Sequence, residues 1–345
     1  MSKITAAITG IAGYVPEYIL TNEELSKMVD TSDEWIMTRI GIKERHILRE
    51  RGQGTSHMAE KAVRKLLNKT NTNTDDIDLL VWCGVTPDMP FPATANIVSD
   101  LVGIKNAFGF DINAGCSSFL FALATVAKFI ETGRYKKIIL IGADKISTFV
   151  DYSDRATCPI FGDGAGAVLI EANTEGYGVI DEILHIDGSG RKHLYQKAGG
   201  SSYPATMETV VNRQHFIYQE GQAVYKAAVS KMPETSLELM QRHGLTSETI
   251  DWLVPHQANL RIIKAVGERM KLPDEKVMVN IQKYGNTTAA TLPLCLWDFE
   301  NKLKKGDNII LTTFGAGFSW GAIYLKWAYD GKTVKEREKQ LEDFN

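Results

Sequence analysis

The sequence repeats three strand-like patterns in the same order in its two halves, and this repetition limits the folds that the chain can adopt. Each pattern contains a short apolar run of the kind that forms a buried strand. Because the order is the same in both halves, we expect two similar units that meet near residue 173. A site between such units would draw residues from both. The paired patterns are IDLLV at Ile77 with IDWLV at Ile250, IIL at Ile138 with IIL at Ile309, and FGDGAGAVLI at Phe161 with FGAGFSWGAIYL at Phe314.

Strand-like and helical patterns alternate along the chain, which predicts an α/β protein. The opening MSKITAAITGIAGYVPE is expected as a first strand and not as a signal peptide, because it carries one lysine and its apolar stretch is broken by glycines. Further strands are expected at 77–84, 137–142, 165–171, 252–255 and 308–313. Helices are expected at 54–68, 93–101, 117–132, 222–242, 260–270 and 292–303.

The composition argues against several classes of protein. The 345 residues carry a formal net charge of -3, so we expect no nucleic-acid partner. The 4 cysteines lie far apart without a CxxC pair, so we expect no disulfide framework and no metal site, and a cytoplasmic location fits them. No run reaches the roughly 18 apolar residues that span a bilayer, so no membrane partner is expected. The charged segment 330–345 is expected to form a solvated tail helix or a frayed end.

Cys116 lies in DINAGCSSFLFALATVAKFIETG, among small residues and directly before a long apolar helical pattern. Buried cysteine is common as a small hydrophobe, so core packing is one interpretation. The other is nucleophilic chemistry, because the N-terminus of a helix carries about half a positive charge, which stabilises a thiolate. This segment alone leaves both roles open.

Two polar residues of the second half, like Cys116, stand shortly before a predicted helix. His256, in VPHQANLRII, follows a predicted strand and precedes an apolar helix, which is where α/β folds place functional residues; it could equally cap that helix. Asn286, in NIQKYGNTTAATLPLCLW, lies in a tight turn before a helix, where asparagine is also common for structural reasons. The other histidines are expected at the surface. With Cys116 these residues form a candidate set in which one attacks, one moves or shares protons and one donates a hydrogen bond.

Two glycine-rich stretches have different expected roles. TTFGAGFSWGA is a turn between two strand patterns, whose N–H groups either approach a substrate oxygen or allow tight strand packing. FGDGAGAVLIEA lacks the GxxxxGK[ST] order of a triphosphate loop, and no GxGxxG opens a helix after a strand. Neither a nucleoside triphosphate site nor a dinucleotide site is therefore expected.

These motifs together resemble the β-ketoacyl-acyl carrier protein synthase III family, the condensing enzymes that initiate type II fatty acid synthesis. The resemblance extends over about residues 3 to 329. It implies the thiolase-like α/β fold, in which two duplicated halves form five layers, α-β-α-β-α. Residues 1–172 would form the half with the nucleophile, and 173–329 the half with the histidine and asparagine. The motifs that carry it are TNEELSKMVDTSDEWIMTRIGIKERHI, TPDMPFPATA, DRATCPIFGDGAGA, PHQANLRII, YGNTTAATLP and FGAGFSWG.

The resemblance implies an acyltransferase that works through an acyl-cysteine intermediate. Cys116 would take a short acyl group from coenzyme A, with acetyl as the expected starter. His256 and Asn286 would assist decarboxylation of malonyl-acyl carrier protein, because loss of carbon dioxide leaves negative charge on the thioester oxygen that two fixed donors stabilise. This role requires a neutral His256 with a ring N–H directed at the site. The backbone N–H groups of Cys116 and of the 315–317 turn, at Ala316, would form a second oxyanion hole.

Other residues match substrate-binding positions of the family. The coenzyme A thioester is a substrate, and no permanently bound cofactor is implied. A homodimer is expected, because Phe91 matches a residue that enters the partner's acyl pocket. The matching positions are Trp35, Arg39, Arg155 and Gln222 for coenzyme A, Phe91, Phe161, Gln219, Gly221 and Phe314 for the acyl pocket, and Arg261 for the acidic carrier protein.

The sequence departs from the family's usual pattern at several positions. Gly115 and Ser118 give AGCSSF where AACSGF or AACCGF is usual, Ile40 stands where threonine is common, and Gln219 stands where an apolar residue such as Met often lies. These differences leave the starter acyl group open. The main alternative is therefore a same-fold enzyme of secondary metabolism with another starter acyl-CoA or acceptor.

Three other classes are less favoured. A thiolase would need a second catalytic cysteine, whereas Cys295 follows Pro293 in an apolar helical pattern and is expected in the core. The PHQAN and YGNT motifs disfavour a hydroxymethylglutaryl-CoA synthase. A non-catalytic partner of another synthase would not need Cys116, His256 and Asn286 together.

Overall fold

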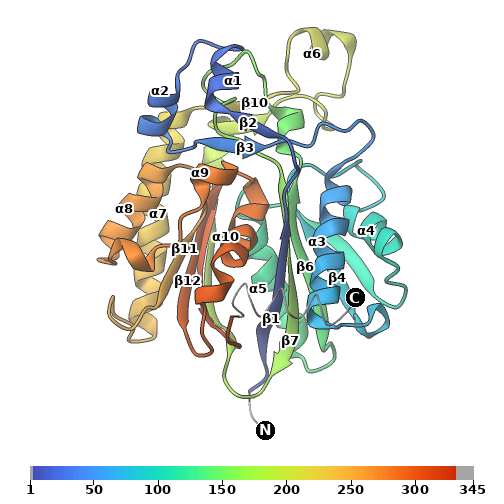
Figure 1. Ribbon diagram of the computed structural model, residues 1–345, viewed down its shortest axis with the longest axis vertical. Coiled ribbons are helices and arrows are strands. Elements are labelled where there is room, and N and C mark those ends of the chain that lie inside the picture. The colour runs from blue at the N-terminus through green and yellow to red at the C-terminus, as the bar shows by residue number, and fades with distance from the viewer. Residues whose placement is uncertain (1–2, 332–345) are drawn as a thin grey trace.

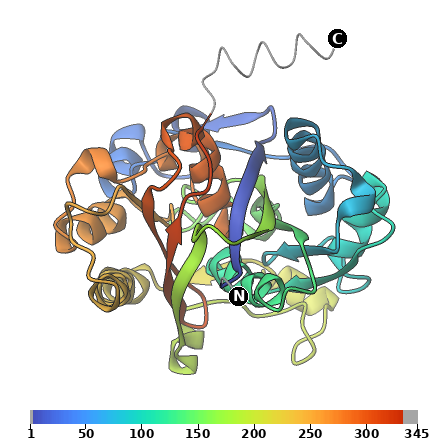
Figure 2. The same ribbon diagram turned by 90° about the horizontal axis from the view of Figure 1, so that it is seen from below.

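The computed structural model describes residues 3–331, which form layers of helices and sheets. Figure 1 shows two sheets side by side, with helices between them and on both outer sides. Figure 2, a view from below, shows the same succession of helix, sheet, helix, sheet and helix. Among the described residues no helix is both long and apolar enough to cross a membrane.

The first sheet lies within the N-terminal half of the chain. Its three inner strands are almost wholly buried, and their near-continuous apolar sequences suit a sheet covered on both faces. β4 pairs in parallel with β5 and β6, whereas β7 pairs antiparallel with β6 and β1. Its strands, in spatial order, are β1 (Thr5–Tyr14), β7 (Gly164–Asn173), β6 (Lys137–Asp144), β4 (Leu79–Cys83) and β5 (Phe108–Ile112).

The second sheet uses the later part of the chain. β11 and β12 are parallel, and β13 pairs antiparallel with both β12 and β8. All its strands follow the last strand of the first sheet in the chain, so the two sheets use separate stretches of sequence. Its strands, in spatial order, are β11 (Trp252–Pro255), β12 (Asn308–Gly315), β13 (Ser319–Lys326) and β8 (Gly178–Ile186).

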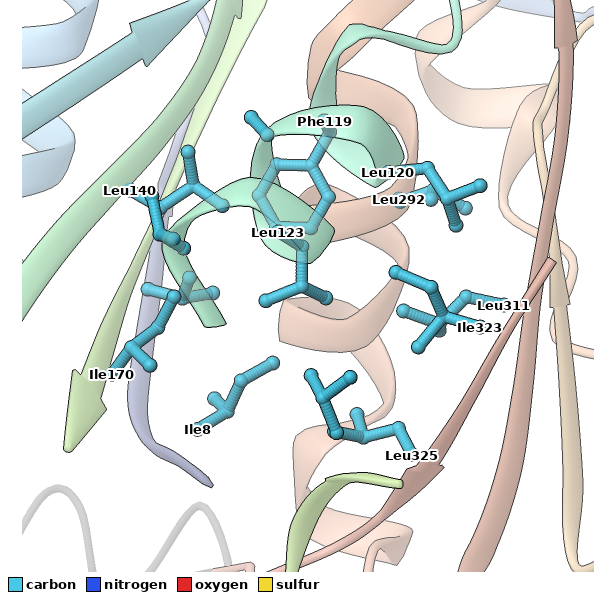
Figure 3. Packing of buried hydrophobic residues seen from close by; sticks show 14 of the residues in the cluster. Ile8, Phe119, Leu120, Leu123, Leu140, Ile170, Leu292, Leu311, Ile323 and Leu325 are labelled. Atoms are coloured by element: carbon cyan, nitrogen blue, oxygen red, sulfur yellow. The ribbon is translucent and has the colours of Figure 1, made fainter. Parts of the chain in front are cut away.

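The central layer consists of α5 (Ser118–Glu131) and α10 (Thr291–Phe299). α5 contacts strands of both sheets, which explains why the helix is apolar around most of its circumference. Figure 3 shows side chains of α5 between residues of the first sheet and residues of the second. Separate apolar clusters join the outer faces of the sheets to α3 (Thr55–Thr70) and α4 (Thr94–Val102) on one side, and to α7 (Gly221–Arg242) and α8 (Leu260–Arg269) on the other.

Short elements gather over one end of the sheets, at the top of Figure 1. The segment with α6 projects from the hairpin of β9 and β10. The short strands and helices are β2 (Ile19–Thr21), β3 (Glu44–His46), β9 (Leu194–Gln196), β10 (Ile217–Gln219), α1 (Asn22–Ser26), α2 (Asp33–Arg39), α6 (Met207–Val211) and α9 (Ile281–Tyr284). Turns of 3-10 helix lie at Thr74–Asp76, Ile146–Phe149, Gly188–Lys192, Asp274–Lys276, Thr288–Ala290 and Glu300–Lys302.

The strands and helices predicted from sequence are present, with ends that differ by a few residues. The largest difference is in the helix expected at 292–303, which ends at Phe299 and continues as a 3-10 turn. The strands not expected from sequence are β5, β8 and the short strands β2, β3, β9 and β10. The predicted tail at 330–345 lies, from residue 332 onward, outside the described residues. We retain the division at residue 173 as a proposal, supported by the separate sequence ranges of the two sheets.

Candidate active site

Cys116 lies between β5 and α5, where the two halves of the chain approach each other closely. Gly115 has φ +61, and a Cβ built there would lie 2.9 Å from the backbone nitrogen of Ala316. A Cβ on Gly315 would likewise lie 2.7 Å from the Cys116 nitrogen. The Ser118 hydroxyl donates to the Gly115 carbonyl at 2.6 Å and accepts from the Ala114 N–H at 2.8 Å. Gly115 and Ser118, the two departures next to Cys116, thus have local structural roles: Gly115 permits the turn, and the Ser118 hydroxyl holds it in place.

The thiol of Cys116 reaches the cavity, yet protein surrounds its sulfur. The surroundings raise the pKa of Cys116 to about 12: burial is the largest cause, the negative charge of Asp144 also raises the pKa, and hydrogen bonding from Asn286 lowers it. The N-terminus of α5 was expected to acidify this thiol, and burial and Asp144 act in the opposite direction. Proton transfer must therefore accompany attack by Cys116.

Alkylation of Cys116 by iodoacetamide is expected to accelerate continuously from pH 7 to pH 10. A thiol with a pKa of about 12 gains thiolate roughly tenfold per pH unit throughout this range, whereas an ordinary thiol levels off near its own pKa of about 8.5. Mass spectrometry of the peptide containing Cys116 gives the rate at each pH. A plateau near pH 7 would show that the helix N-terminus outweighs burial.

His256 follows β11 directly, and its backbone N–H donates to the Thr312 carbonyl at 2.8 Å. Burial lowers the pKa of His256 to about 3, so the imidazole is neutral at physiological pH, as its expected role requires. Its Nδ1 lies 2.7 Å from the Thr291 hydroxyl, and that hydroxyl also lies 2.9 Å from the Thr288 carbonyl. One hydroxyl proton cannot serve both. His256 therefore carries its proton on Nδ1 when Thr291 donates to the carbonyl, and on Nε2 when Thr291 donates to Nδ1.

Asn286 is held by backbone and side chain together. It follows Gly285, whose φ is +66. Its N–H donates to the Ile160 carbonyl at 2.8 Å, and its carbonyl accepts from the Gly162 N–H at 3.1 Å. Its side-chain Oδ1 accepts from the Thr288 N–H at 2.8 Å, which leaves the amide NH₂ as the donor for the cavity.

The three residues line one cavity of about 1050 Å³. The other histidines are exposed or only partly buried, so His256 is the buried histidine of the described chain. Most of the substrate-binding residues expected from sequence share this cavity. They are Trp35, Arg39, Gln222, Phe161, Gln219, Gly221, Phe314, Ala316 and Arg261.

Arg155 and Phe91 do not line the cavity within this chain. The Arg155 guanidinium lies 5.1 Å from the ring centre of Trp35 and pairs with Asp30 at 3.2 Å, so it stands beside Trp35 without lining the cavity. Phe91 is 83% exposed. A phenyl ring so exposed has no role in the acyl pocket of its own subunit.

Sequence reasoning missed three residues that support the site. Asp144 ends β6 and is fully buried, and Thr288 and Thr291 follow Asn286. A polar residue at the carboxyl end of a buried strand is a signal that could have identified Asp144. No cluster of His, Cys, Asp and Glu suited to a metal ion is present within residues 3–331.

The fold is that of the thiolase-like condensing enzymes. The chain aligns with the crystal structure of 3-oxoacyl-[acyl-carrier-protein] synthase III from Aquifex aeolicus with a TM-score of 0.86 and 39% identity, over 93% of this chain and 100% of the other. It also aligns with the priming β-ketosynthase of the R1128 polyketide pathway, with a TM-score of 0.87 and 27% identity over 95% and 97% of the two chains. The five-layer fold predicted from sequence is confirmed.

Sequence comparison places the chain within this class. Residues 110–188 match the family model "3-Oxoacyl-[acyl-carrier-protein (ACP)] synthase III", and residues 240–327 match the model of its C-terminal part. The β-ketoacyl-[acyl-carrier-protein] synthase III 2 of Bacteroides thetaiotaomicron is 62% identical over 96% of this chain and 99% of its own length. The synthase III of Porphyromonas gingivalis strain ATCC 33277 is 55% identical over 97% and 100%. The chain belongs to the β-ketoacyl-acyl carrier protein synthase III family and is an acyltransferase of the condensing type.

Proposed function

We propose that the chain condenses a short acyl-CoA, with acetyl-CoA as the expected starter, with malonyl-acyl carrier protein. The products are 3-oxoacyl-acyl carrier protein, coenzyme A and carbon dioxide. The observation that carries this proposal is the meeting of Cys116, His256 and Asn286 on one cavity, from three separate stretches of the chain.

In the first step the Cys116 sulfur attacks the thioester carbonyl of acyl-CoA. The thiol is protonated at rest and burial disfavours a charged imidazole, so the proton moves only as the carbon–sulfur bond forms. Nε2 of His256 accepts it in the tautomer in which Thr291 donates to the Thr288 carbonyl, and passes it on to the sulfur of the departing coenzyme. The new bond joins sulfur to the acyl carbon, the bond to coenzyme A breaks, and the coenzyme leaves with the proton. The N–H groups of Cys116 and Ala316 are suited to hold the oxyanion, since both residues line the cavity.

In the second step malonyl-acyl carrier protein loses carbon dioxide. The electron pair moves onto the thioester oxygen, where the Asn286 amide and Nε2–H of His256 donate to it. This tautomer forms when the Thr291 hydroxyl turns to donate to Nδ1. The resulting enolate attacks the acyl carbon, and Cys116 leaves and regains a proton from the medium.

The remaining cavity residues have roles that follow from their chemistry. Trp35 offers an aromatic face for adenine, while Arg39 and the nearby Arg155 offer charge for phosphates, with Gln222 as a further polar contact. Phe161, Phe314, Gln219 and Gly221 border the space for the acyl group. The exposed Phe91 is free to enter the pocket of a second subunit, so we retain the homodimer as part of this proposal.

The decisive experiment is a panel of acyl-CoA substrates of different length and branching, each tested with malonyl-acyl carrier protein. Mass spectrometry measures acyl transfer to the protein, and carbon dioxide release measures condensation. Preferential use of acetyl-CoA supports the proposal. Efficient use of only long or unusual acyl groups would contradict acetyl-CoA as the starter. A protein that gained no acyl mass would contradict the proposed acyl transfer to Cys116.

Arg261→Glu is expected to raise KM for malonyl-acyl carrier protein at least tenfold more than KM for acyl-CoA. Arg261 is exposed at the cavity rim, with its guanidinium 5.2 Å from the Tyr225 ring centre, so a reversed charge there acts on the approach of an acidic partner. The matched control is Lys136→Glu, just before β6 at the end of the sheet away from the cavity. Steady-state kinetics at two salt concentrations measure both constants. Equal changes in the two KM values would show that Arg261 acts on acyl-CoA binding as much as on the carrier protein.

A further inference from the structure

Asp144 is a carboxyl group buried behind the nucleophile, and the two steps above give it no role. It is 0% exposed, and it lies at the end of β6. Its two oxygens take part in five hydrogen bonds, three of them with backbone N–H groups that can only donate. Burial raises the pKa of Asp144, whereas the hydrogen bonds from Thr288, Thr86 and Val85 lower it and so favour the ionised carboxylate. A buried charge is costly to keep, so its retention beside the site calls for a function.

One oxygen of Asp144 anchors the segment that leads towards Phe91. Oδ1 accepts from the Val85 N–H at 2.7 Å, from the Thr86 N–H at 2.8 Å and from the Thr86 hydroxyl at 2.7 Å. Val85 itself lines the cavity. This oxygen therefore fixes one part of the cavity wall.

The other oxygen anchors the turn that follows Asn286. Oδ2 accepts from the Ala289 N–H at 3.3 Å and contacts the Thr288 hydroxyl, which also lies 2.8 Å from the Thr287 carbonyl. Beside an ionised carboxylate this hydroxyl donates to Oδ2, because a charged acceptor binds it more strongly than a carbonyl. Thr288 has φ +51, a conformation that a β-branched residue adopts only under constraint. Its bond to Asp144 holds the residue in this conformation.

Thr288 in turn orients both polar residues of the proposed decarboxylation step. Its N–H donates to Oδ1 of Asn286 at 2.8 Å, and its carbonyl accepts from the Thr291 hydroxyl that contacts His256. A change at Thr288 would therefore misdirect the amide of Asn286 and alter the balance of His256 tautomers.

We infer that Asp144 is a positioning residue, whose ionised carboxylate holds Thr288 and thereby directs Asn286 and His256 at the malonyl thioester. This inference rests on the proposed function. The same charge also acts on Cys116 and favours the protonated thiol in the resting enzyme. One buried carboxylate thus links the nucleophile to the two donors.

The first test compares Asp144→Asn with the wild type in iodoacetamide alkylation of Cys116 from pH 6 to pH 10. Removal of the charge is expected to move the rate profile to lower pH by about one unit or more. Loss of a merely structural contact would not move the profile in this direction, and thermal melting confirms that the variant is folded. An unchanged profile in a folded variant would overturn the electrostatic part of the inference.

The second test uses Thr288→Val and Thr288→Ser, which keep Asp144 intact. The valine variant lacks the hydroxyl, and the serine variant retains it. We expect malonyl decarboxylation reduced at least tenfold in Thr288→Val and within about threefold of wild type in Thr288→Ser. Acyl transfer from acetyl-CoA should fall less than decarboxylation in Thr288→Val, because that step uses His256 but not Asn286. Equal decarboxylation in the two variants, or an equal loss of acyl transfer and decarboxylation in Thr288→Val, would overturn the positioning role. Wild-type protein that gained no acyl mass would instead refute the proposed function, and the alkylation test would remain valid.

Discussion

Cys116→Ala is expected to abolish both acyl-enzyme formation and condensation, while leaving part of the malonyl decarboxylation activity. Alanine lacks the sulfur that forms the thioester, so no covalent intermediate can form. The donors proposed for decarboxylation belong to His256 and Asn286, which the substitution leaves in place. The measurements are intact-protein mass after mixing with acetyl-CoA, and carbon dioxide release from malonyl-acyl carrier protein.

The matched control for this prediction is Cys158→Ala. Cys158 is buried in an apolar cluster and does not line the cavity, so this variant should still gain the acyl group. Acylation of Cys116→Ala at the wild-type rate would assign the nucleophile to another residue.

Asn286→Ala is expected to slow condensation by roughly 100- to 1,000-fold, the usual loss when one oxyanion donor is removed. Acyl transfer to Cys116 should continue, because the oxyanion of that step is assigned to backbone N–H groups. Single-turnover acylation and steady-state condensation separate the two effects.

Asn286→Asp serves as the companion variant. It keeps the oxygen that accepts from the Thr288 N–H at 2.8 Å, and so preserves the turn, but replaces the NH₂ donor with a second acceptor. If the donor matters, both variants lose condensation. Full activity in Asn286→Asp would show that Asn286 serves only to hold the turn.

Cys116, His256 and Asn286 could be proposed from sequence because each lies next to the end of a predicted helix or strand, or in a turn. Cys116 precedes a helix, His256 follows a strand and Asn286 lies in a glycine turn, and these features need only neighbouring residues to be recognised. Their meeting could be expected only from the resemblance and the repeated halves, since their distances depend on how the two sheets pack.

The supporting residues were harder to foresee. Asp144 follows an apolar run as an ordinary strand-ending carboxylate, and its charge matters only because the fold buries it beside Cys116. Thr291 begins an apolar helix, where threonine suggests packing, yet its hydroxyl contacts His256. The pKa of Cys116 was also beyond local sequence, because desolvation depends on the whole surrounding structure.

The close approach of Gly115 to Ala316 makes catalysis depend on the assembly of two parts of one molecule. The turn between β7 and β8 is exposed at 174–176, and the nucleophile lies before it while His256 and Asn286 lie after it. A chain cut in this turn would leave an incomplete reactive centre on each fragment. Condensation activity recovered after mixing the two fragments would therefore measure their reassembly. The enzyme's own reaction could then be used to follow how two separate polypeptides associate.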